Sequence, residues 1–344
     1  CVASECAAVR NGVAVLDLPG FTKVEVTGRG AAAHLDHLLC SRLPGTGRVA
    51  LCYALLPDGK LLSELTVSRL GDDRFYLVGA ASAEWHDLDV LEDALPPDGS
   101  VALTNVTADL GSLVVVGPRS REVLAAITSS PLDTAAFPWM SVRTIDTSVG
   151  PVRTLRVNYV GELGWELHAA NDQLVALYQA VWDAGESHGI RDFGIYAVDS
   201  LRLDKCYPGW KTDLEIGFSP FDAGLHRFVD LTKADFVGRS ALVREREAGN
   251  AWRFVAMTLD EDGDADAPFC ASIFDDVGRA ARRIGIVTSG GWSFTLSKSV
   301  ALGYVLPRYD AEGTKVGIKI FGEMKAATVG ATPLYDPTYE RPRM

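Results

Sequence analysis

The sequence contains few cysteines, and they form no recognisable pattern. Apart from Cys1 and Cys6, the six cysteines lie far apart along the chain, so neither a disulfide framework nor a zinc-binding spacing is visible. The first residues lack the basic start, apolar run and small-residue cleavage site of a signal peptide. These absences favour a reduced, cytoplasmic protein. Because the sequence starts at Cys rather than Met, we expect its native beginning to lie upstream.

Long hydrophobic runs and an excess of positive charge are also missing. No apolar run approaches the roughly 20 residues that a membrane-crossing helix needs, so we expect no membrane partner. The 45 acidic residues outnumber the 33 lysines and arginines, which gives a formal net charge of −12. Because basic residues drive binding to nucleic acids, a nucleic acid is excluded as the main partner. A small ligand needs only local positive charge.

The 344 residues are too many for one ordinary core, since domains usually hold roughly 100–150 residues. Residues 22–26 (TKVEV) alternate polar and apolar side chains, which predicts a strand with one buried face, and AAAHLDHLL after it predicts a helix. The same order recurs in LVVVGPRSREVLAAI at residues 113–127. Two strand–glycine–helix units indicate an α+β architecture with an internal pseudo-repeat.

The first of these units also matches a dinucleotide-binding pattern at residues 28–33 (GRGAAA). A Rossmann first strand is buried on both faces, whereas this one carries Lys23 and Glu25. The next strand-like run, RVALCYALL, ends at the turn PDG (57–59) and not at a ribose-binding acid. We therefore interpret the glycines as a tight turn into a helix.

An Asp-Gly pair predicts a hairpin in YALLPDGKLLSELTVSRL and places Glu64 on its second strand. Further strand-like runs meet at Gly161, and the helical pattern LVALYQAVWDAGESHG ends at Gly189. The polar stretch REREAGN (244–250) precedes a region rich in β-branched residues and glycine turns. We place a boundary there and predict a small β-barrel or sandwich over 251–344.

Common catalytic signatures are absent, because the sequence has no P-loop, HExxH or GxSxG motif and no Cys–His pair at a recognisable spacing. His34 and His37 lie three residues apart without a further ligand, so we expect no metal site. Carboxylates and aromatic residues beside glycines remain. This set suits a flat heterocycle, bound by stacking and by a carboxylate that accepts two parallel N–H bonds.

Five segments in order carry a family resemblance: NYVGELGWE (158–166), YAVDSLRLDKCYPGWKTDL (196–214), SPFDAGL (219–225), ADFVGRSAL (234–242) and TSGGWSFTLSKSVALGYV (288–305). They resemble the glycine cleavage T-protein (aminomethyltransferase) superfamily over nearly the whole chain. DGKLLSELTVSRL, KCYPGWKTDL and IFGEMKAATVGATPLYDP are similar to the folate-binding half of dimethylglycine and sarcosine dehydrogenases, where a flavin domain precedes this region.

The resemblance implies an α+β fold of three domains in a cloverleaf around a central cleft, with a ferredoxin-like folate-binding part and a C-terminal β-barrel. We assign residues 1–45 and 140–245 to the folate-binding domain, 46–139 to a second α+β domain and 251–344 to the barrel.

The implied activity is transfer of a methyl or methylene group from a small N-methyl or S-methyl compound to tetrahydrofolate. One alternative is the glycine-cleavage aminomethyltransferase, which needs a lipoyl carrier protein. Another is a folate-binding module, either non-catalytic or the C-terminal half of a flavin dehydrogenase.

The resemblance also implies roles for individual residues. The family's pterin-binding glutamate maps to Glu166, and Glu162 is the competing candidate. The family's catalytic aspartate maps to Glu64, which keeps the carboxylate and lengthens its reach. The expected cofactor-binding residues are Glu166, Glu162, Tyr159, Tyr53 and Arg202.

The folate tail and the methyl donor are the least readable ligands. The two family arginines near the tail map to Val198 and to residues 321–322, so the tail contacts must differ. Tyr207, Trp210 and Trp85 offer aromatic faces to an N-methylated cation, with a cation–π attraction of roughly 0.5–2 kcal/mol. A core role for each of these three is the alternative.

Overall fold

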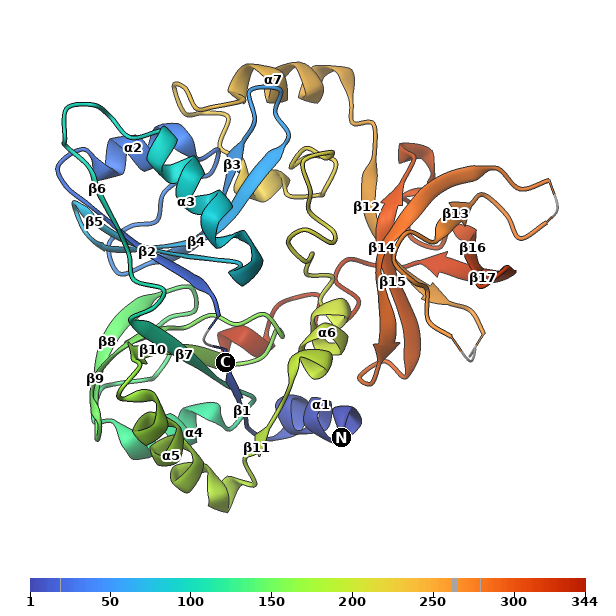
Figure 1. The fold of residues 1–344 in the computed structure, drawn as a ribbon. Helices are drawn as coiled ribbons and strands as arrows, with labels where there is room; N and C mark the ends of the chain where they lie inside the picture. The colour runs from blue at the N-terminus through green and yellow to red at the C-terminus, as the bar shows by residue number, and fades with distance from the viewer. Residues whose placement is uncertain (19, 262–264, 279) are drawn as a thin grey trace.

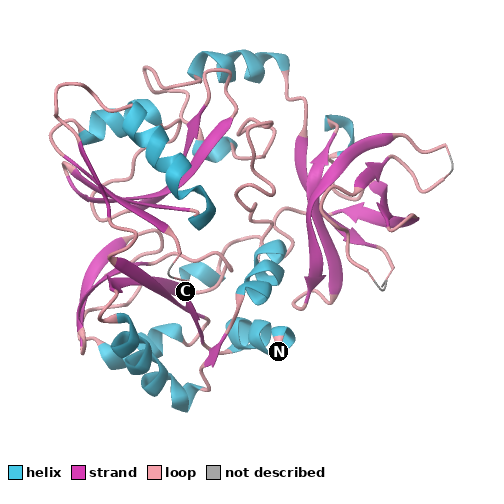
Figure 2. Ribbon diagram, viewed as in Figure 1, coloured by secondary structure: helices cyan, strands magenta, loops and turns pink. Residues whose placement is uncertain are grey.

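A computed structural model describes residues 1–344 except residue 19, residues 262–264 and residue 279 (Figure 1). The strands form a six-stranded sheet, a five-stranded sheet and a closed barrel. Figure 2 shows the two sheets one above the other with helices outside them, and the barrel set to one side. Among the described residues, no helix combines the length and apolar character that crossing a bilayer would require.

The six-stranded sheet has the strand order β11-β1-β7-β10-β9-β8. Helices α4 and α5 cover one face through apolar side chains such as Leu124 and Leu177. Helices α1 and α6 pack at one end of the other face. The elements are α1 (Val2–Asn11), β1 (Ala14–Asp17), β7 (Leu110–Val116), α4 (Ser120–Ile127), β8 (Val142–Thr147), β9 (Gly150–Leu155), β10 (Gly164–Ala170), α5 (Leu174–Gly185), β11 (Arg191–Asp192) and α6 (Ile195–Asp204).

The five-stranded sheet has the strand order β3-β4-β5-β2-β6. Helices α2 and α3 cover its outer face, and its inner face packs on the six-stranded sheet through Tyr76, Val78 and Leu155. The elements are β2 (Thr22–Thr27), α2 (Ala31–Leu38), β3 (Val49–Leu55), β4 (Leu61–Gly71), β5 (Arg74–Gly79), α3 (Glu84–Asp93) and β6 (Ala102–Asn105).

The barrel follows a long irregular segment and helix α7, and it confirms the predicted C-terminal barrel. After β17 the chain runs back to the six-stranded sheet, where the C-terminus lies (Figure 1). The elements are α7 (Arg239–Ala248), β12 (Arg253–Leu259), β13 (Ser272–Phe274), β14 (Arg283–Ser293), β15 (Lys298–Val305), β16 (Lys315–Ile320) and β17 (Glu323–Val329). Short 3-10 turns are η1 (Ala81–Ala83), η2 (Glu186–His188), η3 (His226–Phe228), η4 (Pro307–Tyr309) and η5 (Arg341–Arg343).

The two predicted strand–glycine–helix units occupy equivalent places, one in each sheet. Gly28 after β2 has φ +116° and Gly117 after β7 has φ +119°. A Cβ at Gly28 would lie 2.3 Å from the Ser100 oxygen, and one at Gly117 would lie 2.4 Å from the Gly12 oxygen. Only glycine fits such a close approach with positive φ. The strand β2 is antiparallel to both its neighbours, which confirms that the first unit is not a dinucleotide-binding βαβ unit.

The sheets divide the chain differently from the predicted boundaries. Strand β2 and helix α2, expected with residues 1–45, belong to the five-stranded sheet, while β7 and α4, expected within 46–139, belong to the six-stranded sheet. Alternation along a strand predicts which face is buried but not which distant strand is the partner.

The prediction of one solvated face for β2 is also wrong, because Lys23 is fully buried between the two sheets. Its Nζ donates to the Phe21 carbonyl at 2.7 Å.

Candidate functional site

Glu64 and Tyr53 lie directly opposite each other on the neighbouring strands β4 and β3. Opposite residues of an antiparallel pair project to the same face, here the face away from α2 and α3. Tyr53 is fully buried and packs edge-on against Phe228, with ring centroids 5.8 Å apart. In the part of the chain that the structure describes, its hydroxyl has no hydrogen-bond partner. An unpaired buried hydroxyl costs about 1–3 kcal/mol, so this position points to a ligand.

Burial raises the pKa of Glu64 to about 7, the nearby Tyr53 hydroxyl opposes that rise, and the negative charge of Asp87 adds to it. The Tyr53 hydroxyl forms no hydrogen bond of ordinary geometry with Glu64 among the described residues. A carboxyl group that titrates near neutrality can hold or release a proton at working pH. Asp87 lies on α3, accepts a hydrogen bond from Ser63 at 2.7 Å, and has its own pKa raised to about 6 by burial.

Tyr159 adjoins this pair from the segment between β9 and β10 of the six-stranded sheet. Burial raises its pKa; Arg202 opposes the rise and Glu64 adds to it. Its hydroxyl donates to the Pro208 carbonyl at 2.6 Å, and its ring stacks on Tyr207 with centroids 5.9 Å apart. The structure thus brings together four predicted residues from two sheets and the segment after α6.

The Tyr207 ring continues into an aromatic stack that sequence reasoning missed. Tyr207 stacks on Tyr339, and Tyr339 stacks on Trp139, with centroids 6.5 Å and 6.2 Å apart. The Lys205 ammonium lies 4.2 Å from the Tyr339 ring centre. These aromatic residues come from three distant segments, so no spacing in the sequence signals them.

Arg202 braces the junction between α6, the following segment and the barrel. Its guanidinium donates to Asp213 at 2.8 Å, to the Ser289 hydroxyl at 2.9 Å and to the Tyr207 carbonyl at 3.3 Å. Asp199 lies 3.4 Å away. Most of the N–H donors of Arg202 are therefore used within the protein. Arg202 thus braces this junction, and few of its donors are left for a cofactor.

Glu166 belongs to a second polar group between the two sheets. The buried His168 lies 3.3 Å from it through Nε2, and the Tyr76 hydroxyl lies 3.0 Å from His168 Nδ1. Burial lowers the pKa of His168, so the imidazole ring is neutral. When the Tyr76 hydroxyl donates to Nδ1, the ring proton is on Nε2, and this N–H donates to Glu166. Burial also lowers the pKa of Lys23 to about 8, against the attraction of Glu166. Glu166 is held in place with acceptor capacity left for a ligand.

Glu162, the competing candidate for the pterin-binding glutamate, has a structural role instead. It is fully buried; Arg10 donates to its Oε1 at 3.0 Å and Arg341 to its Oε2 at 2.8 Å. The Tyr335 hydroxyl adds a bond at 3.2 Å. Arg10 also pairs with Asp204 at 2.8 Å. Because both oxygens are engaged, Glu162 ties α1, α6 and the C-terminal segment together instead of facing a ligand.

The two predicted tryptophans are placed differently from each other. Trp210 packs in the core around Tyr53, carries Lys211 Nζ 4.9 Å from its ring centre, and leaves a buried indole N–H unpaired among the described residues. Trp85 lies on α3 with 75% of its surface exposed, and no described contact joins it to the Glu64 group. The structure therefore does not bring Trp85 together with Tyr207 or Trp210 through any described ring contact.

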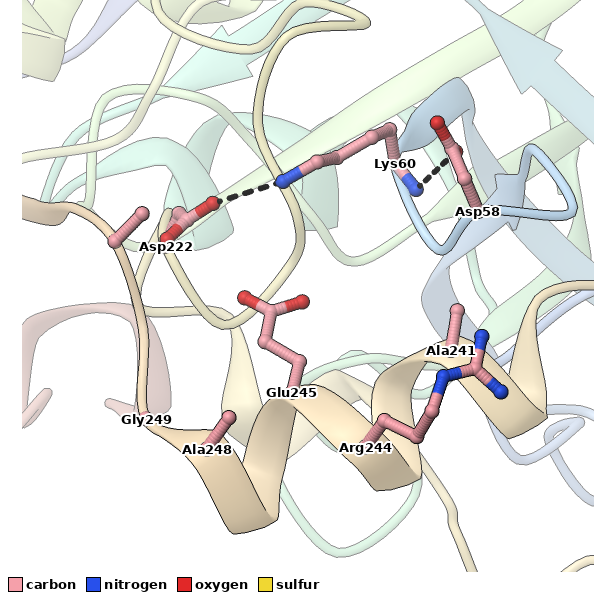
Figure 3. A pocket seen from close by; sticks show the side chains of 9 residues that line it. Asp58, Lys60, Asp222, Ala241, Arg244, Glu245, Ala248 and Gly249 are labelled. Atoms are coloured by element: carbon pink, nitrogen blue, oxygen red, sulfur yellow. Dashed lines mark hydrogen bonds and ion pairs between the residues drawn. The ribbon is translucent and has the colours of Figure 1, made fainter.

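A separate polar pocket of about 330 Å³ lies beside α7 (Figure 3). Two of its acidic side chains are engaged within the protein: Asp222 accepts from Lys60 at 3.3 Å and from the Trp252 amide at 3.0 Å, and Glu245 accepts from the Ser219 hydroxyl. Asp222 thus fastens the hairpin of the five-stranded sheet to the first barrel strand. Over the described ranges, no group of three or more His, Cys, Asp or Glu side chains could hold a metal ion.

Two sheets, a closed barrel and a glutamate opposite a buried tyrosine define the class of this protein. Family profiles match the same sequence. The GCVT N-terminal domain profile matches residues 1–233, and the glycine cleavage T-protein C-terminal barrel domain profile matches residues 253–336. The chain belongs to the glycine cleavage T-protein family of the aminomethyltransferase superfamily.

Particular relatives differ in length and activity. Dimethylglycine dehydrogenase of Homo sapiens is 36% identical over 99% of this chain, which spans 39% of that relative. An aminomethyltransferase of Alkaliphilus oremlandii is 27% identical over 96% of this chain and 89% of its own length. The crystal structure of glycine cleavage system aminomethyltransferase T from Bartonella henselae matches with a TM-score of 0.87 at 25% identity, over 98% of this chain and 90% of that one. The predicted T-protein fold is confirmed.

Proposed function

We propose that this chain transfers a one-carbon group from a small methylated amine, betaine or sulfonium compound to tetrahydrofolate. The observation that carries the proposal is the pairing of Glu64 with the unsatisfied Tyr53 hydroxyl on an inward strand face. Membership of the T-protein family supports it, as does the identity with dimethylglycine dehydrogenase.

The Glu64 group and the Glu166 group together offer the polar partners that a reduced folate needs. A pterin carries ring N–H and amino donors that a carboxylate such as Glu166 accepts. The orphaned donors of Tyr53 and Trp210 are available to its acceptors. Tyr159 and Tyr207 add flat aromatic surface beside Glu64.

Tetrahydrofolate, when bound, supplies the nitrogen that receives the one-carbon unit. Glu64 supports positive charge on the donor when ionised and accepts a proton when one is released. Tyr53 lies opposite that carboxyl group, and the packed strands β3 and β4 fix the positions of both residues. Transfer from a quaternary ammonium or sulfonium depends mainly on such alignment, because the leaving group departs neutral.

Glu166→Gln is expected to weaken binding of reduced folate by about 1.5–3 kcal/mol, the value of a hydrogen bond to a charged group. Isothermal titration calorimetry with tetrahydrofolate measures the change. Glu186→Gln, at an exposed position of the same sheet unit, is the matched control and should bind as the parent does. Unchanged affinity in Glu166→Gln would remove this residue as the pterin anchor, and the engaged Glu162 could not replace it.

A second candidate function is favoured by the 36% identity with dimethylglycine dehydrogenase. Under this second function, the chain is the folate-binding part of a flavin-dependent dehydrogenase and takes up a methylene group released by oxidation. Incubation of the chain with tetrahydrofolate and a methyl donor distinguishes the two candidate functions. A methyl-folate product formed without an electron acceptor supports direct demethylation, whereas a methylene product that requires a flavoprotein and an oxidant supports the second. Replacement of the family aspartate by Glu64 counts against the glycine-cleavage reaction.

A reducing, cytoplasmic location remains part of the proposal. All six cysteines are free, and four of them are buried. The name of the dimethylglycine dehydrogenase relative includes the word mitochondrial, so cell fractionation has to decide between the two compartments.

A further inference from the structure

A cavity of about 540 Å³ lies between helix α6, the start of α1 and the barrel strand β14. Its volume falls in the range of roughly 300–1,000 Å³ that small-molecule sites occupy. Four aromatic side chains line it, Tyr196, Phe269, Trp292 and Phe294, and Gly290 and Gly291 form part of its wall. The cavity, here called the α6–β14 cavity, contains neither Glu64 nor Glu166.

The aromatic side chains of this cavity are unusually accessible. Tyr196 is 77% exposed, Phe269 is 63% exposed and Phe294 is 38% exposed. Scattered single apolar side chains on a surface need no explanation, but several around one concavity mark an interaction site. Aromatic rings attract cations through their faces, whereas aliphatic side chains do not.

The charges at the cavity favour a cation. Asp199 lines it with 57% of its side chain exposed, and its contact with Arg202 is long, at 3.4 Å. Arg202 is already paired with Asp213 at 2.8 Å, so one positive charge meets two negative charges and leaves a net charge of −1. None of the described residues lining the cavity is a lysine. The overall charge of −12 adds a long-range attraction for cations.

We propose that the α6–β14 cavity binds a small methylated ammonium cation against Tyr196 and Trp292, with Asp199 as its counter-ion. Methyl groups on nitrogen pack against aromatic rings while the delocalised charge interacts with the ring faces. A metal ion would need several oxygen ligands, and a single exposed carboxylate does not provide them. The residues that line this cavity include neither Glu64 nor Glu166, and the proposal does not depend on the proposed function.

Titration calorimetry of the whole chain with choline, and with its neutral isostere 3,3-dimethylbutan-1-ol, tests this site. The two probes have the same shape and differ in charge. Choline is expected to bind with a millimolar dissociation constant and the neutral isostere roughly tenfold more weakly, because only the cation gains from the rings and the carboxylate. Equal binding of the two probes, or no binding of choline, would overturn the proposal.

Two exposed positions allow substitutions that do not disturb folding. Asp199→Asn should weaken choline binding roughly fivefold or more, and Tyr196→Leu roughly two- to fivefold, as for a lost exposed cation–π contact. The matched controls are Asp89→Asn on α3 and Phe321→Leu in the turn after β16, both exposed. Choline quenching of tryptophan fluorescence that persists in Trp292→Phe would place the cation elsewhere. If Tyr196→Leu changed the oligomeric state and left choline binding intact, the patch would be a protein interface and the proposal would fail.

Discussion

Glu64→Gln is expected to lower kcat by roughly 10²–10³, the scale for removing one electrostatic contributor at a reacting centre. Gln keeps the shape of the side chain and removes both its charge and its titration. Because the pKa of Glu64 is raised to about 7, the parent's kcat should rise with pH through neutrality as the carboxylate forms. The variant should lose that rise. Single-turnover kinetics between pH 5.5 and 8.5 measure both effects, and a parent-like rate in the variant would remove Glu64 from the mechanism.

The same substitution should stabilise the fold at alkaline pH. In the unfolded chain Glu64 ionises near its ordinary pKa of 4.5, whereas in the folded chain it ionises near 7. Between these values the folded state holds a proton that the unfolded state has lost, so stability falls as pH rises through 7. Gln avoids this loss, which is on the order of 1–3 kcal/mol at pH 8. Urea unfolding at pH 5 and pH 8 should show the gain only at pH 8; equal stability at both pH values would mean that Glu64 is solvated.

Glu162→Gln is expected to destabilise the chain by about 3–5 kcal/mol, the cost of breaking a buried charge pair. Glu162 is the shared partner of Arg10 and Arg341. Without its charge, Arg10 keeps Asp204 as an acidic partner, and Arg341 loses its carboxylate contact at 2.8 Å. The free energy of unfolding in urea at pH 7 measures the loss.

The matched control for this prediction is Glu340→Gln, one residue before Arg341 and exposed. A surface change of this kind should stay within about ±0.5 kcal/mol. If Glu162→Gln unfolds the chain outright, Arg341→Gln provides a milder test, because the Arg341 side chain is 31% exposed. Parent-like stability in both Glu162→Gln and Arg341→Gln would show that the network does not hold the units together.

Local patterns in the sequence predicted the local elements well. The Asp-Gly pair at residues 58–59 predicted the β3–β4 hairpin, where Gly59 has φ +86°, and alternation placed Glu64 on β4. Gly189 ends the helical stretch in the left-handed conformation, with φ +68°. These features depend on residues close in sequence, which is why their spacing is informative.

The roles of Glu162 and Glu166 could not be separated from the sequence, because they are the same residue type four positions apart in one motif. What separates them is contact with distant segments. Arg10 and Arg341 lie 152 and 179 residues from Glu162, and no local pattern indicates that they meet there. The same reason explains the stack of Tyr207, Tyr339 and Trp139.

The predicted assignment of strands to the two sheets differs from the structure for a related physical reason. A polar residue such as Lys23 in an alternating strand predicts a solvated face, yet a second sheet covers that face. The burial of Lys23 lowers its pKa to about 8, because removal from water disfavours the charged ammonium form. Sheet-on-sheet packing is a tertiary choice that overrides the pattern of a single strand.

The barrel is attached at both of its ends, at β12 through Asp222 and beyond β17 through Arg341. Arg202 on α6 holds the barrel at a further point, through Ser289 of β14 at 2.9 Å. A unit fastened at several points is restrained from rotating about a single hinge, as the lobes of many ligand-closing enzymes do. Entry of a ligand must then rely on rearrangement of side chains and short segments, not on opening of whole units. The radius of gyration in solution is accordingly expected to stay constant when a ligand is added.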